Sequence, residues 1–334
     1  MQPKKVDQPN RQRSWAALFS ILAAVVLLYL ALQGIDWGTF WDTLRYGHYE
    51  ILLLTMPIAS LGYIIRALRW SVLVRVEQSV PVRLIFWANM VGYLGNAYLP
   101  ARAGELLRSG FLGRKTGLGM SFLLATALSE RILDTLALVL IGSVALLLQA
   151  NISSVLGEAV RMMALAGIVG LAVILAAPFQ EQVLLRVLRR IPLPAGINDK
   201  IAKQISRFLV GMRSLHNVRR LVTFLLLTAI IWLIDGIANM IGAHIVGQTL
   251  DLGQALILLS ALGLSSAIPS TPGSLGVYQI VAVIVLTPFG FSRAEALAFI
   301  LISQVSTYLT VTFWGLLGLW RIGRMSNPQS TPVE

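Results

Sequence analysis

The sequence predicts an all-α integral membrane protein with about six full transmembrane helices and two re-entrant helical hairpins, arranged as inverted repeats. The first observation is composition: 56% of the 334 residues are hydrophobic and 13% are charged, whereas about a quarter of the residues in soluble domains are charged. The second is that apolar runs of roughly the 20 residues needed to span a bilayer recur along the chain. The third is that basic residues gather between these runs, as in cytoplasmic loops. Together these observations exclude soluble enzymes and secreted modules.

The composition also limits the chemistry and the partners. The chain contains no cysteine, which excludes cysteine-ligated metals, thiol catalysis and disulfide bonds. His48, His216 and His244 are scattered without the spacing of a metal site. We therefore expect no metal, no cofactor and no catalytic residue. The net charge of +12 comes from basic residues between membrane segments, so the predicted partners are membrane lipids and not nucleic acid.

The first span is predicted at residues 15–32, after a cytoplasmic tail at 1–14. The tail is basic, which places the amino terminus in the cytoplasm of a plasma (inner) membrane protein. A cleaved signal peptide is the alternative, but the apolar run exceeds the usual core of up to about 15 residues and lacks an A-x-A-like cleavage site. Residues 34–50 mix tryptophans with acidic residues and predict a short helix in the outer interface.

Five further spans complete a single polytopic membrane domain over residues 15–325, followed by a cytoplasmic tail at 326–334. They are predicted at 51–73, 121–149, 162–178, 221–246 and 294–320. A basic linker, 180–220, joins the halves; it is either a surface helix on anionic lipid or an ordinary loop that fixes orientation. Most of the 27 Lys and Arg residues, including Arg66, Arg69 and Arg108, then fall on the cytoplasmic side, with both termini.

Two apolar stretches are interrupted and are predicted to be re-entrant hairpins. Residues 82–113 are broken at 99–105 and have basic residues at both ends, so this hairpin enters from the cytoplasm. Residues 253–290 are broken at 268–276, and both arms are too short for a span. The order span, hairpin, span thus occurs in residues 51–149 and again, in opposite orientation, in 221–320. Inverted repeats with broken helices are the recurrent architecture of secondary transporters and predict a polar midplane cavity.

Ionisable residues at bilayer depth are functional candidates because each costs about 2.5–3.5 kcal/mol to insert. Glu130 and Asp134 share one face of the span at 121–149, beside Arg131. The predicted substrate-binding residues are Asn96, Arg102, Glu105, Glu130, Arg131, Asp134, Asp235, Ser270, Thr271, Tyr278 and Gln279. The predicted hinge or gate residues, at the two hairpin tips, are Pro100, Gly104, Pro269, Pro272, Gly273 and Gly276.

Each of these signals also has a structural interpretation. Arg102 with Glu130, and Arg131 with Asp134, are equally well explained as buried ion pairs that hold the fold together. Asp235 and Asn239 are spaced for a hydrogen bond between helices. For the whole set, we favour a binding role.

Four motifs in this order resemble the flippase-like transmembrane domain of the lysylphosphatidylglycerol synthase family. They are Arg66-Ala-Leu-Arg69-Trp70, Asn96 to Arg108, Ser129 to Asp134, and Pro269 to Gln279. A familiar variant has Gly at position 274 and Glu at 279, so a proton-coupling role is in doubt at Gln279. The resemblance implies movement of a lipid between leaflets and homodimers. It also implies that the aminoacylating domain of the full-length synthases is absent, because about ten residues follow Arg324.

The sequence therefore predicts a lipid flippase whose cargo is an anionic phospholipid, a polyprenyl lipid or a glycolipid. Arg102 and Arg131 would contact the phosphate, and Glu105, Glu130 and Asp134 would orient them. One alternative is a membrane-embedded glycosyl- or phosphoryl-transferase that uses external Asp36 and Asp42. The other is a scaffold that recruits a lipid-modifying enzyme through the 180–220 linker.

Overall fold

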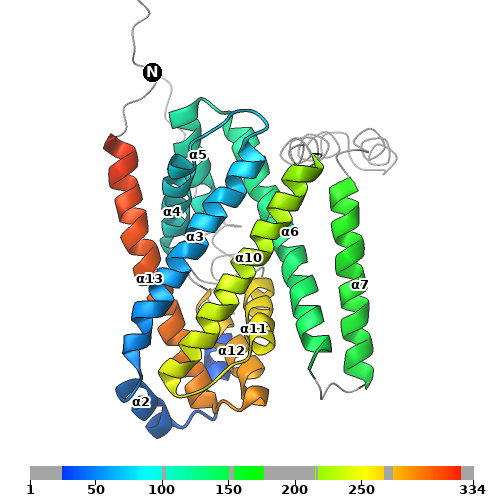
Figure 1. Ribbon diagram of the computed structural model, residues 1–334. Helices are drawn as coiled ribbons and strands as arrows, with labels where there is room; N and C mark the ends of the chain where they lie inside the picture. Colours follow the sequence, from blue (N-terminus) through cyan, green and yellow to red (C-terminus); the bar gives the residue numbers. More distant parts are fainter. Residues whose placement is uncertain are drawn as a thin grey trace, which may run out of the picture.

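The computed structural model describes residues 25–99, 103–149, 154–176, 215, 217–266 and 274–324. Within these ranges all regular structure is helical, which confirms the predicted class (Figure 1). Residues 25–32 are helical, and three short 3-10 helices, η1, η5 and η7, adjoin longer helices. The longer helices are α2 (Trp37–Arg45), α3 (Leu52–Val74), α4 (Val82–Tyr98), α5 (Gly104–Thr116), α6 (Met120–Leu147), α7 (Ser154–Ala176), α10 (Val218–Ala243), α11 (Leu252–Ser265), α12 (Val277–Leu286) and α13 (Arg293–Arg324).

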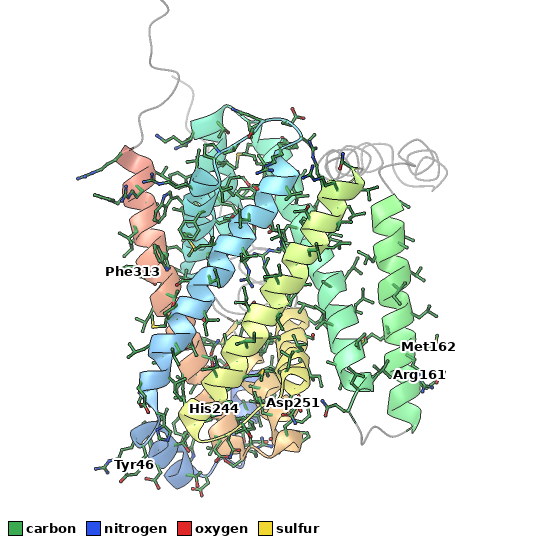
Figure 2. The ribbon with its side chains drawn as sticks, in the orientation of Figure 1. Tyr46, Arg161, Met162, His244, Asp251 and Phe313 are labelled. Carbon is green, nitrogen blue, oxygen red and sulfur yellow. The ribbon has the colours of Figure 1, made fainter. Side chains whose placement is uncertain are left out.

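Three helical segments in the described chain are long and apolar enough to cross a membrane: Tyr49–Val74, Val218–Val246 and Arg293–Arg324. Figure 2 shows Phe313 and Met162 pointing outward from opposite sides of the molecule, and both side chains are more than half exposed. Large apolar side chains on an outer surface are unfavourable in water and favourable in lipid. The chain is therefore a membrane protein.

The predicted spans correspond to α3, α6, α7, α10 and α13. The largest difference at a described end is in α7, which begins at Ser154 and not at 162. The turns before residue 162 contain two exposed charged residues, Glu158 and Arg161, and are therefore not part of the apolar run. These two residues form an ion pair at 3.2 Å, since i,i+3 spacing places them on the same side of the helix. The two tails, most of the predicted first span and most of the 180–220 linker lie outside the described residues.

Two pairs of short helices lie at the predicted hairpins. α4 packs against α5, and α11 packs against α12, and the pairs lie toward opposite ends of the molecule (Figure 1). These helices have 17, 13, 14 and 10 residues, so each is shorter than the roughly 20 residues of a span. The helical breaks agree with the predicted ones, since α4 ends at Tyr98 before α5 begins at Gly104, and α11 ends at Ser265 before α12 begins at Val277.

The most extensive packing between the two halves of the described chain is in three helix pairs. α3 lies along α10, α4 along α13, and α6 along α11, and Figure 1 shows α3 and α10 side by side in the centre of the view. Small residues allow close approach: a Cβ at Gly142 of α6 would lie 2.7 Å from Ser260 Cβ of α11. Within the first half, α6 also packs against α5 and α3, and these contacts bring the charged residues of the three helices together.

Candidate functional site

Three arginines and three carboxylates from α3, α5 and α6 form one continuous set of ion pairs. We call this set the charge cluster; its members are Arg69, Glu105, Arg108, Glu130, Arg131 and Asp134. On α5, Glu105 and Arg108 are spaced i,i+3, and on α6, Glu130 and Asp134 are spaced i,i+4, so the charged residues of each pair share a face. If all six groups are ionised, three positive charges balance three negative ones, and the attraction and hydrogen bonds between them offset part of the cost of taking them out of water.

Arg69 of α3 is the buried centre of the cluster. Its side chain is 2% exposed. Both terminal nitrogens donate to Asp134, at 2.5 and 2.8 Å, and Nη2 also donates to Glu130 Oε1 at 2.8 Å. Nη1 reaches Thr228 Oγ1 of α10 at 3.2 Å. The planar guanidinium suits this fork-like geometry, and it joins α3 to α6 and to the second half of the chain.

Arg108 of α5 pairs with two carboxylates, Glu105 and Glu130. Its Nε donates to Glu105 Oε2 at 2.6 Å, and Nη1 donates to Glu130 Oε2 and to Asn89 Oδ1, both at 3.0 Å. The guanidinium lies 4.6 Å from the centre of the Trp70 ring, a favourable cation–π distance. Glu130 is thus held by two arginines, one from α3 and one from α5.

Arg131 of α6 is the accessible member of the cluster. It donates to Glu105 Oε1 from Nη2 at 2.6 Å and from Nε at 3.0 Å, yet 42% of its side chain is exposed. Glu105 keeps a second partner in Arg108. An incoming anion could therefore take the place of Glu105 on Arg131 without leaving that carboxylate unpaired.

A separate ion pair connects α3 to α10. Arg66 Nη2 donates to Asp235 Oδ2 at 2.5 Å, and about a fifth of each side chain is exposed. Asn239 donates to the backbone carbonyl of Asp235 and not to its carboxylate. Asp235, a predicted binding residue, is thus a partner of Arg66 at the contact between the two halves.

Side-chain amides bind the backbone at the starts of α5 and α12, directly after the two helical breaks. Asn96 Oδ1 accepts from the Gly104 backbone N–H at 3.0 Å. In the second hairpin, Gln279 Oε1 accepts from the Gly276 N–H and Gln279 Nε2 donates to Gln304, both at 2.6 Å. The predicted residues Asn96 and Gln279 therefore cap short helices. Tyr278, another predicted binding residue, is the second residue of α12.

The structure joins four of the predicted binding residues, Glu105, Glu130, Arg131 and Asp134. Glu105 holds Arg131, as the binding hypothesis expects, whereas Glu130 and Asp134 both pair with Arg69, which is not among the predicted binding residues. Seven of the predicted residues, Pro100, Arg102, Pro269, Ser270, Thr271, Pro272 and Gly273, lie outside the described residues.

Comparison with known proteins agrees with these motifs. Residues 17–315 match the family described as the lysylphosphatidylglycerol synthase TM region. The chain belongs to this family. It is also 23% identical to a UPF0104 membrane protein of Methanothermobacter thermautotrophicus, in an alignment that covers 97% of this chain and 98% of that protein. No solved structure matches the chain. Membership is consistent with a membrane function related to lipids.

Three residues of this family member were missed as site residues by sequence reasoning. Arg66, Arg69 and Arg108 were assigned to the cytoplasmic side by the positive-inside rule, whereas the structure pairs all three with carboxylates inside the helix assembly. The sequence contains one usable signal. Arg66 and Arg69 are three residues apart on an otherwise apolar helix, a spacing that puts both on one face and calls for acidic partners.

Ser274 departs from the glycine of the familiar family pattern, and its backbone shows the consequence. It is the one non-glycine residue with positive φ in the described chain, at 56°. The left-handed conformation costs a residue with a side chain about 1–2 kcal/mol, and glycine would avoid this cost. Glycine also loses more conformational entropy on folding, which cancels about 0.5–1 kcal/mol of the gain. We expect Ser274→Gly to raise the stability by about 0.5–1 kcal/mol, measured by thermal unfolding in detergent. Ser303→Gly, within α13, is the matched control and should lower it; a loss of stability in both variants would contradict this account.

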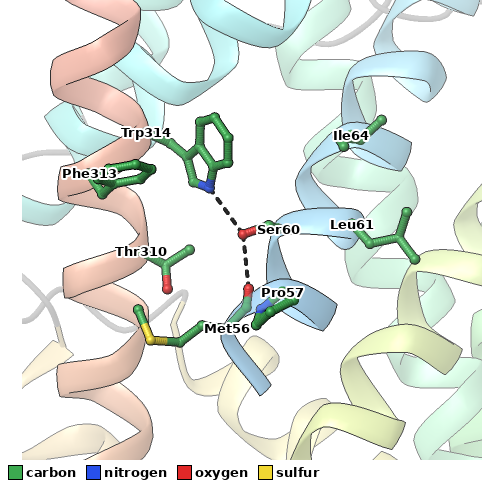
Figure 3. A pocket seen from close by; sticks show the side chains of 8 residues that line it. All are labelled: Met56, Pro57, Ser60, Leu61, Ile64, Thr310, Phe313 and Trp314. Carbon is green, nitrogen blue, oxygen red and sulfur yellow. Dashed lines mark hydrogen bonds between the residues drawn. The ribbon is translucent and has the colours of Figure 1, made fainter. Parts of the chain in front are cut away.

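The hollow between α3 and α13 differs from the predicted polar cavity. Its volume is about 440 Å³ (Figure 3). The indole N–H of Trp314 donates to Ser60 Oγ at 3.0 Å, and Ser60 donates to the Met56 carbonyl at 2.9 Å. The few polar groups in its wall are thus already paired, and the hollow suits an apolar occupant. It is lined by Met56, Pro57, Ser60, Leu61, Ile64, Thr310, Phe313 and Trp314.

Asp36, a residue of the alternative transferase hypothesis, caps α2. Its carboxylate accepts from the Thr39 hydroxyl at 2.8 Å and from the backbone N–H groups of Gly38 and Thr39. The hydrogen bond from the Thr39 hydroxyl, with the two backbone bonds, holds the pKa of Asp36 below its ordinary value. A carboxylate that is ionised and bonded in this way stabilises the helix start and is poorly suited to act as a general acid.

Proposed function

We propose that the protein is a flippase that moves an anionic phospholipid, or another lipid with a phosphate-containing headgroup, between the leaflets of the plasma membrane. The observation that carries the proposal is the charge cluster, a balanced set of six charges in a chain of low charge content, with Arg131 accessible at its edge. Intramembrane charges are costly and mark substrate pathways. The family, whose description names a synthase of an aminoacylated phosphatidylglycerol, supports a phospholipid cargo.

In this proposal Arg131 exchanges one anion for another. In the structure it is held by Glu105, and a lipid phosphate would replace that carboxylate with a bidentate bond of the same kind. Glu105 would remain on Arg108, so the exchange leaves no buried charge unpaired. Arg102, proposed from the sequence, is the second phosphate contact, and Glu130 and Asp134 hold Arg69 and Arg108 in place.

The proposed arrangement in the bilayer has six spans, two re-entrant hairpins and both termini in the cytoplasm. It is supported by the short α4–α5 and α11–α12 pairs, which lie toward opposite ends of the molecule (Figure 1). The Pro/Gly tips of the hairpins are proposed as gates, the acyl tails stay in the bilayer, and the active form is proposed to be a homodimer.

The test is lipid movement in liposomes that contain the purified protein. A fluorescent phosphatidylglycerol is added to the outer leaflet, and after a set time an impermeant reductant bleaches the label that is still there. The fraction of fluorescence that survives is lipid that has moved to the inner leaflet. We expect Arg131→Ala to slow transfer at least about tenfold, equivalent to about 1.4 kcal/mol of barrier, while the unfolding temperature changes little because Glu105 keeps Arg108. Arg131→Lys should retain part of the rate, since it keeps the charge and loses the fork geometry.

The controls separate binding from folding and from the transferase alternative. Arg161→Ala removes an exposed arginine of α7, and Asp36→Asn with Asp42→Asn removes the external carboxylates; both should leave the rate unchanged. Equal rates in protein-containing and empty liposomes would reject the flippase. A loss of transfer in the Asp36/Asp42 variant with full transfer in Arg131→Ala would favour the external site instead.

A further inference from the structure

The helix bounds of the two halves correspond one to one when the chain is shifted by 166–177 residues. α3 ends at Val74 and α10 ends at Ala243, 169 positions later; α6 begins at Met120 and α13 begins at Arg293, 173 positions later. The packing follows the same correspondence. α4 with α13 and α11 with α6 are equivalent pairs, whereas α3 with α10 is a pair of mutually equivalent helices. In an inverted repeat, a contact between two equivalent helices, here α3 with α10, lies on the pseudo-two-fold axis.

The close contacts of the two outer pairs lie at similar positions in the repeat. A Cβ at Gly142 would lie 2.7 Å from Ser260 Cβ, and a Cβ at Gly315 would lie 2.6 Å from Leu94 Cβ and 3.1 Å from the Met90 carbonyl oxygen. Gly315 follows Gly142 by 173 positions, and Ser260 follows Met90 by 170. We call the α6–α11 and α4–α13 contacts the two seams. The same glycine-mediated approach thus closes both seams in the structure.

The ion pair between α3 and α10 lies on the axis itself. Arg66 and Asp235 are 169 positions apart, the same separation as the ends of their helices, so each occupies the position equivalent to its partner. A Cβ at Gly62, one turn earlier on α3, would lie 3.0 Å from Arg66 Nη1, 3.4 Å from Asp235 Oδ1 and 3.6 Å from Ile234 Cγ2. The crossing of α3 and α10 is therefore centred near this pair.

We propose that the α3–α10 crossing at Arg66–Asp235 is a fixed pivot, and that the two seams open alternately to opposite sides of the membrane. The inference rests on the proposed function for its transport role and on the repeat for its geometry. In a protein with inverted repeats, the second state is reached when the halves exchange conformations. In that exchange each seam takes the conformation that the other had. Arg66 and Asp235 are equivalent residues, so their contact is the same before and after the exchange. The pair is therefore common to both states, whereas a different seam opens in each of them. Since both seams are closed in the structure, it corresponds to the occluded state between the two.

The absence of cysteine makes the test direct, because introduced pairs form the sole disulfides. One seam pair is Leu138→Cys with Gly263→Cys, because a Cβ added at Gly263 would lie 3.5 Å from Leu138 Cγ. The other is Val91→Cys with Gly318→Cys, because a Cβ added at Gly318 would lie 3.3 Å from Val91 Cγ2. The pivot pair is Gly62→Cys with Ile234→Cys, which leaves Arg66 and Asp235 in place. Each pair is studied reduced and oxidised, and the reduced form must be folded and active.

After oxidation, we expect either seam disulfide to slow phosphatidylglycerol transfer at least about tenfold, with recovery on reduction. The pivot disulfide should change the rate less than about twofold. A pivot disulfide that blocks transfer as strongly as the seam disulfides would overturn the proposal, and so would seam disulfides without effect.

A second measurement does not depend on lipid transfer. Single cysteines at Val91 and Leu138 are exposed to an impermeant thiol reagent from each side of oriented vesicles, with Ile234→Cys as the pivot control. We expect the two seam cysteines to react from opposite sides and the pivot cysteine from neither. If the protein moves no lipid but this pattern holds, the flippase proposal fails and the pivot stands; if both seams react from one side, the pivot proposal fails.

Discussion

Replacement of Arg69 by alanine is expected to lower the free energy of unfolding by about 3–5 kcal/mol, the cost of removing one partner from a buried ion pair. Arg69 is 1% exposed and makes three hydrogen bonds to Glu130 and Asp134. Without it, Asp134 loses its described ionic partner and Glu130 keeps Arg108 alone. Unfolding in mixed detergent micelles, followed by tryptophan fluorescence, provides the measurement.

Two further variants show whether unpaired charge is the cause. Arg161→Ala removes an arginine from the exposed pair with Glu158 and should change the stability by less than about 0.5 kcal/mol. Arg69→Met combined with Glu130→Gln and Asp134→Asn should recover part of the loss, because no isolated buried charge is left. If Arg69→Ala is as stable as Arg161→Ala, the charge cluster does not hold these helices together.

The second large effect is expected for Gly104→Ala, with a loss of about 3 kcal/mol. Gly104 is the first residue of α5, where this helix touches α4. An added Cβ would overlap the Gly92 carbonyl oxygen and would lie 2.5 Å from Asn96 Oδ1. A backbone oxygen cannot move aside as a flexible side chain does, so the two helices must separate. The Asn96 bond to the Gly104 N–H would weaken with them.

Gly110→Ala, on the same helix, is the matched control for the Gly104 variant. A Cβ at Gly110 meets nothing within 4 Å, so the higher helix propensity of alanine should stabilise α5 by up to about 1 kcal/mol. Thermal unfolding of both variants in detergent makes the comparison. Equal unfolding temperatures for Gly104→Ala and the unmodified protein would show that the α4–α5 contact is looser than described.

The helices and their breaks were predictable because their signals are local. The interruption at 99–105 was placed from Pro100 and Gly104, and the structure ends α4 at Tyr98 and begins α5 at Gly104. Proline removes a backbone donor and clashes with the preceding turn, and neither effect depends on the rest of the fold. The short helix predicted within 34–50 is α2, which begins at Trp37 after the capping side chain of Asp36, another local signal.

The membrane location, the helical class and the carboxylates Glu105, Glu130 and Asp134 as site candidates all followed from hydropathy and spacing along the chain. The choice of ionic partners did not. Arg69 meets Glu130 across 61 residues and Arg66 meets Asp235 across 169, and helical periodicity gives the face of a residue but not the helix that it faces. Packing of α3 between α6 and α10 made that choice, because charges removed from water must find partners among whichever helices lie beside them.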